Sequence, residues 1–208
     1  MPKATPELIE KRKNEIVDAC EKIYREKGFC GVTIKEISSE TSFTRPAIYN
    51  YYETKDEILL DLLIREYEKW IRDLEKIADN AAGMDTGSLA EALADSLSER
   101  EVLLRIQNMN LYEIEINSRV ERLADFKLLY KKTAEIIRDI LKKAYPGASE
   151  EWVSNIGVTF AALLLGIYPF AFHTEKQIEA MKMADMPNDE STIAELISNA
   201  LRLMLPEE

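Results

Sequence analysis

Helix signals run along nearly the whole chain, and this pattern restricts the possible fold more than any other feature. The apolar residues of the first segment recur near a 3.6-residue period: Ile9, Ile16, Cys20, Ile23 and Tyr24. No stretch shows the alternation of polar and β-branched apolar residues that is typical of a strand. We therefore expect an all-α protein with about nine or ten helices.

Capping boxes predict several helix starts. In this pattern a Ser or Thr is followed three residues later by Glu, and each side chain binds a free backbone N–H of the first turn. Four such segments mark the starts of expected helices: Thr33–Glu36, Thr54–Glu57, Ser98–Glu101 and Ser118–Glu121. The second box begins a long amphipathic helix that we expect to run to about Asn80.

Glycine, proline and small polar residues predict where helices end. The first helix should stop at Lys27-Gly28, and Pro46 is tolerated in the first turn of a third helix. Residues 81–87 and 145–148 are predicted to form loops, and Ser149 should begin an apolar helix. A last helix is expected from about Asp189 to Leu205.

Charge is distributed unevenly along the chain. The 208 residues contain 27 Lys+Arg and 38 Asp+Glu, a net charge of −11, which taken alone argues against a nucleic-acid-binding protein. Residues 1–60 hold 10 basic and 11 acidic residues, a net of −1, so the acidity belongs to the remainder. Several bases of the first part can gather on one side: Lys3, Lys11, Arg12, Lys13, Lys35, Arg45 and Lys55.

Neither a secretory signal nor a membrane span is expected. Residues 1–10 lack an apolar core. Residues 156–172 carry no charge, but these 17 residues fall short of the about 20 that cross a bilayer, and we expect a buried helix there. We interpret Cys20 and Cys30 as reduced, packed thiols of a cytoplasmic protein, with a disulfide between them as the alternative.

The first 55 residues carry the most functional information. Three short helices are expected there, and only Thr41-Ser42-Phe43 separates the second from the third, as in a helix-turn-helix. Short turns also occur in any helical bundle. The third helix, however, is rich in hydrogen-bond donors and aromatic residues, and Ile48 is its clearest apolar anchor. A purely structural helix of this length would bury more apolar surface.

This segment resembles the DNA-binding domain of the TetR family of transcriptional regulators. The resemblance rests on Gly28-Phe29 after the first helix, Thr33 before the second, Ile48-Tyr49, Tyr51-Tyr52, and Lys55-Asp56-Glu57 at the start of the fourth. The chain departs from the family at two neighbouring positions. Ser42 replaces the usual turn glycine, and a serine can adopt the left-handed conformation there at a modest cost. Phe43 replaces a smaller aliphatic residue and should pack under the motif.

The resemblance implies an organisation and a function. Residues 1–55 would form the DNA-binding domain, and residues 56–208 a helical domain for effector binding and dimerisation. A homodimer would bind double-stranded operator DNA as a repressor and leave it when an unknown small-molecule effector binds. Neither a cofactor nor a metal is expected.

The resemblance also assigns roles at the DNA. Arg45 is the best candidate for reading a guanine, and Pro46 and Ala47 for contacting a thymine methyl group. Asn50 would read an adenine or bind phosphate, and Lys35 would meet the backbone or a base edge. The remaining candidates would contact phosphate or sugar through N-terminal helix positions or hydroxyl groups: Thr33, Thr44, Tyr49, Tyr51 and Lys55. The alternative is that these are solvated surface residues.

Two further sites are expected in the C-terminal part. Pocket candidates are apolar and aromatic residues, with Gln107 or Asn108 as polar partners: Leu103, Ile106, Met109, Tyr112, Phe126, Tyr130, Phe160, Leu164 and Tyr168. Small residues four apart and an apolar last helix are candidates for the dimer interface: Gly157, Ala161, Ala162, Gly166, Ile193, Leu196, Ile197, Ala200 and Leu201. Ordinary intrachain core is the alternative for both sets.

An enzyme is not expected. The single histidine, His173, excludes paired Glu-x-x-His ligation, and the sequence contains neither a glycine-rich phosphate loop nor a Cys/His cluster. The remaining alternative to a regulator is a helical protein-interaction module, or a small-molecule-binding protein, that does not bind DNA.

Overall fold

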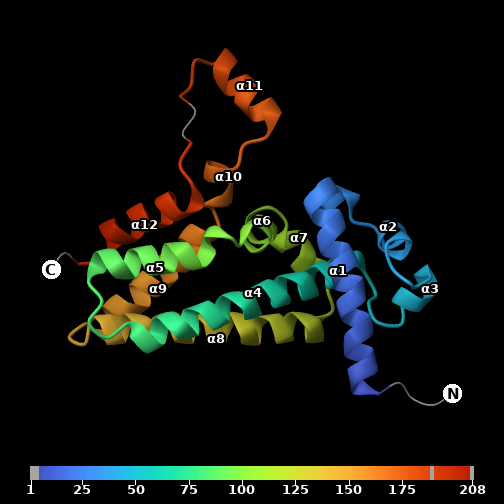
Figure 1. The fold of residues 1–208 in the computed structure, drawn as a ribbon, viewed down its shortest axis with the longest axis horizontal. Helices are drawn as coiled ribbons and strands as arrows, with labels where there is room; N and C mark the ends of the chain where they lie inside the picture. The colour runs from blue at the N-terminus through green and yellow to red at the C-terminus, as the bar shows by residue number, and fades with distance from the viewer. Residues whose placement is uncertain (1–4, 188–189, 207–208) are drawn as a thin grey trace. The chain divides into compact units, whose positions relative to one another are not determined.

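The computed structural model describes residues 5–187 and 190–206, and this part of the chain is all helical (Figure 1). The predicted fold class is confirmed, but the described residues form twelve helices because α7, α10 and α11 were not anticipated. The helices are α1 (Pro6–Gly31), α2 (Ile34–Ser39), α3 (Arg45–Ile48), α4 (Lys55–Asn80), α5 (Thr86–Ser98), α6 (Glu101–Met109), α7 (Leu111–Ile116), α8 (Val120–Ala144), α9 (Glu150–Leu164), α10 (Tyr168–Ala171), α11 (Glu175–Met183) and α12 (Ile193–Met204).

The helices form two compact units. Met1–Arg65 and Asn110–Leu128 make up the N-terminal unit, and Glu66–Met109 and Leu129–Glu208 make up the C-terminal unit. Helices α4 and α8 each contribute residues to both units. The division by function that the sequence suggests, at residues 55/56, stays a prediction.

The core of the N-terminal unit forms where α1, α2 and α3 meet α4. Ile16, Cys20, Ile37 and Ile48 have no exposed surface. The expected helix stop at Lys27-Gly28 is a kink, and α1 continues to Gly31. The φ of Gly28, 68°, lies in the left-handed region that glycine adopts without strain. Cys20 is buried, but Cys30 is exposed, so the expectation that both thiols are packed is wrong for Cys30.

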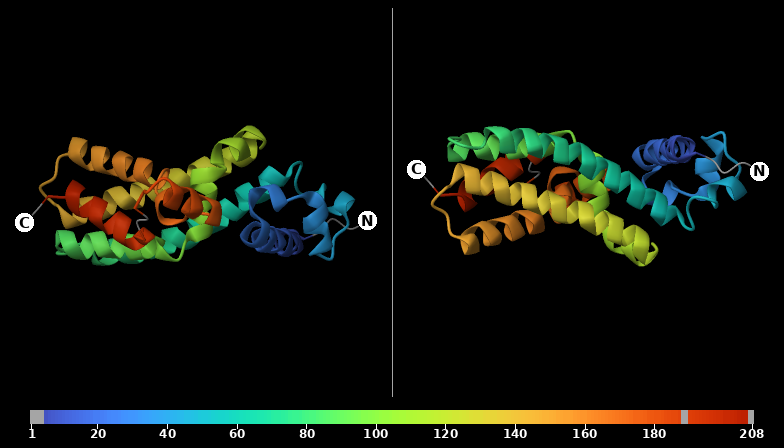
Figure 2. Two further views of the ribbon diagram at one scale, coloured as in Figure 1. Left: turned by 90° about the horizontal axis from the view of Figure 1, so that it is seen from above. Right: turned by 90° about the horizontal axis from the view of Figure 1, so that it is seen from below.

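The core of the C-terminal unit includes a close pairing of α5 with α12, which lie side by side in Figures 1 and 2. Ile197 and Leu201 of α12, and Leu93 and Leu97 of α5, are all buried. A capping box at Thr192 begins α12. The expected start of this helix at Asp189 lies outside the described residues.

Two predicted capping boxes do not form. The Ser98 hydroxyl donates to the Asp95 carbonyl at the end of α5, and the Ser118 hydroxyl donates to the Ile114 carbonyl after α7. Both serines therefore close a preceding helix. By contrast, Ser149 caps α9 as predicted, since its hydroxyl oxygen accepts from the Trp152 N–H.

The apolar segment 156–172 is not one buried helix. α9 ends at Leu164, a turn follows, and α10 begins at Tyr168. Val158 and Phe170 are each 68% exposed, so part of this segment faces outward. Within the described residues, no helix is long and apolar enough to cross a membrane.

Candidate nucleic-acid interface and ligand cavity

Backbone capping defines the helix-turn-helix of α2 and α3. The Thr33 hydroxyl oxygen accepts from the Glu36 N–H at 3.1 Å and begins α2. Thr44 precedes α3, and its carbonyl accepts from the N–H groups of Ala47 (2.9 Å) and Ile48 (3.1 Å). Pro46 fits in this first turn because no intrahelical acceptor exists there for its missing N–H.

Hydrogen bonds fix the turn between the two helices. The Ser38 hydroxyl donates to the Phe43 carbonyl at 2.9 Å, and the Ser42 N–H donates to the Glu15 carboxylate at 2.7 Å. The latter bond lowers the pKa of Glu15. Among the described non-glycine residues only Asp185 has a positive φ, so Ser42 does not use the left-handed conformation that a glycine in this turn could adopt. Phe43 is half-buried and contacts the Tyr51 ring edge-on, as a packing residue would.

Most of the predicted DNA-contacting residues reach the surface. Seven of them are exposed: Thr33, Lys35, Thr44, Arg45, Pro46, Tyr49 and Asn50. Arg45 stands out, because in the described part of the N-terminal unit it is the arginine whose guanidinium makes no hydrogen bond or ion pair. An exposed guanidinium at the first residue of α3 keeps all its donors available for an external acceptor.

Three of the predicted DNA-contacting residues are half-buried: Ala47, Tyr51 and Lys55. The Tyr51 hydroxyl accepts from Arg12 at 3.0 Å. The Lys55 amine lies 3.9 Å from the centre of the Phe29 ring and donates to the Phe29 carbonyl at 3.4 Å. The cation of Lys55 is therefore already engaged within the fold.

The bases of the first part of the chain do not gather as free charges. Besides Arg12 and Lys55, Lys13 is also engaged, because its amine lies 3.8 Å from the Asp61 carboxylate. Lys3 lies outside the described residues. This leaves Lys11 of α1, Lys35 of α2 and Arg45 of α3 as exposed cations.

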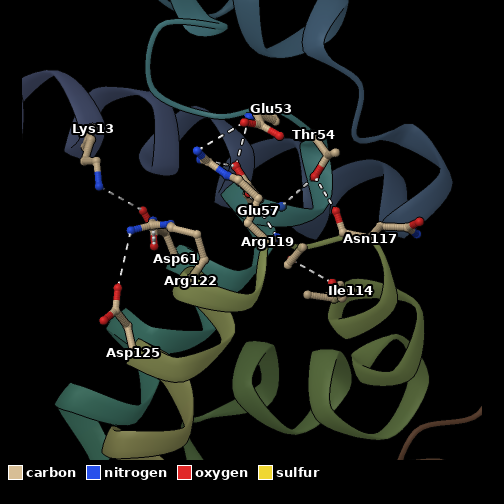
Figure 3. Close-up of polar contacts among 11 residues, drawn as sticks. Lys13, Glu53, Thr54, Glu57, Asp61, Ile114, Asn117, Arg119, Arg122 and Asp125 are labelled. Carbon is tan, nitrogen blue, oxygen red and sulfur yellow. Dashed lines mark hydrogen bonds and ion pairs between the residues drawn. The ribbon is translucent and has the colours of Figure 1, made fainter.

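A buried carboxylate joins the start of α4 to the start of α8 (Figure 3). Glu57 has no exposed surface, and its oxygens accept from the Arg119 N–H (3.2 Å), Nε (2.6 Å) and Nη2 (2.9 Å) and from the Glu53 N–H (2.9 Å). Burial raises the pKa of this carboxyl group, but these hydrogen bonds outweigh burial, and the net pKa is lowered.

A second set of contacts lies beside the first. The buried Tyr52 hydroxyl donates to Asp61 at 2.7 Å. Arg122 binds the other oxygen of the same carboxylate (Figure 3). Burial and the neighbouring Asp61 raise the pKa of Tyr52. Tyr52 directly follows the helix-turn-helix, so Arg119 and Arg122 attach α8 to its base. Sequence reasoning missed both arginines, since nothing in the local pattern pairs residues about sixty positions apart.

The C-terminal unit contains a cavity of about 290 Å³. Its walls come from α4, α6, α8 and α9, and three aromatic side chains are among them: Tyr67, Trp70 and Tyr130. A volume near the lower end of the usual ligand-pocket range of about 300–1,000 Å³ suits a small organic molecule.

Only part of the predicted pocket lines this cavity. Tyr130 and Leu164 do, together with the predicted polar partner Gln107. Met109 (58%) and Tyr112 (81%) are largely exposed, and Phe126 is buried in the N-terminal unit, so none of these three lines the cavity. The remaining candidates are buried outside the cavity lining: Leu103, Ile106, Phe160 and Tyr168. Apolar character alone could not distinguish core from cavity wall.

The predicted dimer residues divide by exposure. Ile193, Ile197 and Leu201 are buried within the chain, where α12 packs on α5. Their position agrees with the alternative interpretation, ordinary intrachain core. Leu196 and Ala200 are half-buried, and Gly157 and Ala161 are half-buried and line the cavity. Ala162 and Gly166 are exposed, near the outward-facing Val158 and Leu165.

Family models match both parts of the chain. Residues 16–62 match the model for bacterial regulatory proteins of the tetR family, and residues 64–206 match the tetracyclin repressor-like C-terminal domain. The second match covers more than half of the chain, and the protein therefore belongs to the TetR family of transcriptional regulators. This membership confirms the prediction of a helix-turn-helix regulator rather than an enzyme.

Individual proteins show more limited likeness. The uncharacterized HTH-type transcriptional regulator YfiR of Bacillus subtilis (strain 168) is 30% identical over 79 residues, 38% of each chain. The regulator HbdR of Aromatoleum sp. (strain CIB) is 37% identical over 54 residues, 26% of this chain and 24% of that protein. The chain thus aligns with well under half the length of these relatives.

Similarity of fold extends further than similarity of sequence. The crystal structure of FadR from Bacillus subtilis in complex with stearoyl-CoA has a TM-score of 0.59 and 15% identity, and the match covers 92% of this chain and 96% of that one. At this identity the likeness shows the fold alone.

Proposed function

We propose that this TetR-family regulator is a homodimeric, cytoplasmic repressor that a small-molecule effector releases from its operator. The observation that carries DNA recognition is Arg45, an exposed guanidinium without an intramolecular partner at the first residue of α3. Its planar fork of donors fits guanine O6 and N7 in the major groove.

The other exposed residues supply supporting contacts. Asn50 reads an adenine or binds phosphate, and Pro46 with the half-buried Ala47 meets a thymine methyl group. Lys35 reaches the backbone or a base edge. Thr33, Thr44 and Tyr49 present hydroxyl groups to phosphate or sugar. Tyr51 and Lys55 act chiefly within the fold, where Tyr51 contacts Arg12 and Lys55 contacts Phe29.

Dimerisation uses the outward face of α9 and the segment that follows it. Val158, Leu165 and Phe170 are exposed apolar residues there, and Ala162 and Gly166 allow a second helix to approach closely. An isologous contact of this face with a second copy would cover this apolar surface.

The effector site is the cavity of the C-terminal unit. Helices α4 and α8 line it, and the same helices contribute Glu57, Asp61 and Arg122 to the N-terminal unit, where Arg119 directly precedes α8. An effector with different affinities for two arrangements of these helices shifts the population between operator-binding and released states. The same fold in FadR was crystallised with stearoyl-CoA, which supports effector binding by this class of domain.

Selection of duplexes from a random pool, followed by gel shifts, tests this function. We expect the dimer to retain one sequence selectively, with an affinity that falls as salt concentration rises. Arg45→Ala is the matched variant, because Arg45 is exposed and its removal leaves the fold intact. Absence of selective duplex binding by the folded protein would favour the alternative of a helical module that does not bind DNA.

A further inference from the structure

The walls of the cavity in the C-terminal unit restrict the class of effector. Gln107 is the buried polar side chain that matters most. It is 5% exposed, and its Oε1 accepts from the Tyr67 hydroxyl at 3.0 Å. Among the described residues, the amide nitrogen of Gln107 has no hydrogen-bond acceptor. Two N–H donors at the cavity wall therefore remain available to a bound molecule.

The other buried polar groups of the cavity have already used their donors. The Thr133 hydroxyl donates to the Leu129 carbonyl at 3.0 Å, and the Trp70 indole N–H donates to the Ser96 hydroxyl at 2.9 Å. The Tyr67 hydroxyl donates to Gln107. In the buried part of the wall, the free donors thus belong to the Gln107 amide, which calls for an acceptor on the ligand.

Charge is confined to the exposed rim. Lys131, Glu135 and Arg138 are exposed, and each has an opposite charge nearby, Lys131 with Glu135 at 3.7 Å and Arg138 with Glu150. The buried part of the wall offers no counter-ion. A charged group placed there would lose its hydration without compensation, so the inner part of the ligand is neutral.

Aromatic rings line one side of the cavity. The Tyr67 ring lies 5.9 Å from Trp70 and 6.2 Å from Tyr130, measured between ring centres. On α9, Gly157 supplies open space, because a Cβ built there meets no atom within 4 Å. This combination favours a planar ring that contacts the aromatic faces and edges.

We propose that the effector is an uncharged aromatic molecule whose ketone, ester or amide oxygen accepts a hydrogen bond from the Gln107 amide. The proposal rests on the proposed function, because it names the class of effector for the same cavity. It also assigns a specificity-determining role to Gln107, a residue between the buried Ile106 and the half-buried Asn108 of α6.

Three matched probes test the proposal by calorimetry with the full chain: 2-acetylnaphthalene, 2-isopropenylnaphthalene and 2-naphthoate. The first two share a shape but differ in the acceptor oxygen. We expect the ketone to bind about three- to tenfold more tightly than the hydrocarbon, because a net hydrogen bond has about that effect. The naphthoate should bind at least about tenfold more weakly than the ketone at pH 7.

Two variants test whether Gln107 is the source of this preference. Gln107→Leu should bring the ratio of ketone to hydrocarbon affinity close to one, and Gln107→Met, which keeps a side chain of similar length without a donor, should do the same. Tyr67→Phe is the matched control, since it leaves the Gln107 amide in place and should keep the preference. Quenching of Trp70 by the ketone in a Trp152→Phe background locates binding at the cavity, because the chain has two tryptophans.

Failure of the proposal and failure of the proposed function are distinguishable. No binding by any probe, equal affinity for ketone and hydrocarbon, tightest binding of the naphthoate, or a preference that survives Gln107→Leu would overturn the proposal. If the probes bind in the expected order but the ketone leaves operator affinity unchanged, the ligand class stands. The proposed release of the operator by an occupant of this cavity is then refuted.

Discussion

Removing the side chain of Arg119 should destabilise the protein by leaving the Glu57 carboxylate buried and short of partners. Arg119→Met deletes the Nε and Nη2 donors at 2.6 and 2.9 Å while retaining the backbone N–H at 3.2 Å. Breaking a fully buried ion pair costs about 3–5 kcal/mol. Arg119 is 41% exposed, so water replaces part of the lost interaction. We therefore expect a loss of about 2 kcal/mol in the free energy of unfolding.

A double-mutant cycle at fixed protein concentration measures the pair itself. Urea unfolding of wild type, Arg119→Met, Glu57→Gln and the double variant should give a coupling energy of about 1–2 kcal/mol. The double variant should be more stable than Arg119→Met alone, because neutral glutamine tolerates burial better than an unpaired carboxylate. A loss below about 0.5 kcal/mol for Arg119→Met, or strict additivity, would refute this reasoning.

The same pair predicts a pH dependence. The pKa of Glu57 is lowered in the folded protein, so its stabilising contribution is present above the ordinary carboxyl pKa of 4.5 and is lost as the pH falls through the lower folded value. In Arg119→Met, burial dominates and raises the pKa. The stability difference between wild type and variant should therefore shrink on acidification, as unfolding curves at pH 7 and pH 4 would show.

Three further variants or treatments follow from single side chains. Gly157→Ala should raise the free energy of unfolding by about 0.5–1 kcal/mol in urea titrations, because alanine favours the helix and its Cβ meets no atom; a loss of stability would contradict this geometry. Asp56→Asn should raise the free energy of unfolding by about 1 kcal/mol at pH 7, since Asp56 Oδ1 is buried without a hydrogen bond and burial raises the pKa of this carboxyl group. This gain should fade as the pH falls and Asp56 becomes protonated. Iodoacetamide followed by mass spectrometry should label the exposed Cys30 quickly and spare Cys20, whose thiol pKa burial raises; equal labelling of the folded protein would argue against the packing of α1.

Local patterns in the sequence predicted the helix-turn-helix itself. Gly28, Thr33 and Pro46 act through their own backbone or the next few residues, so their effects can be read from spacing. Ile48, the predicted anchor of α3, is fully buried. Ser98 and Ser118 show the limit of this approach, because a serine followed by glutamate can also close the preceding helix.

Long-range packing determined what the sequence could not show. Arg119 and Glu57 are 62 positions apart, and no periodicity relates them. The position of Lys55 at the start of α4 predicts a phosphate ligand, yet its amine lies over the Phe29 ring within the fold. The cavity depends on which faces of four helices converge, and the sequence does not show this. Sequence reasoning therefore placed Tyr112 in the pocket, although its side chain is 81% exposed.

Recognition of DNA by α3 is the central claim, and the base preference of Arg45→Ala tests it most directly. Binding of wild type and variant to the selected operator and to every single-base substitution of it can be measured by fluorescence anisotropy at one salt concentration. We expect the variant to lose about 1–3 kcal/mol on the selected operator and to become indifferent at one guanine position, while preferences elsewhere persist. Uniform weakening on all duplexes, or an unchanged profile, would contradict base readout by Arg45.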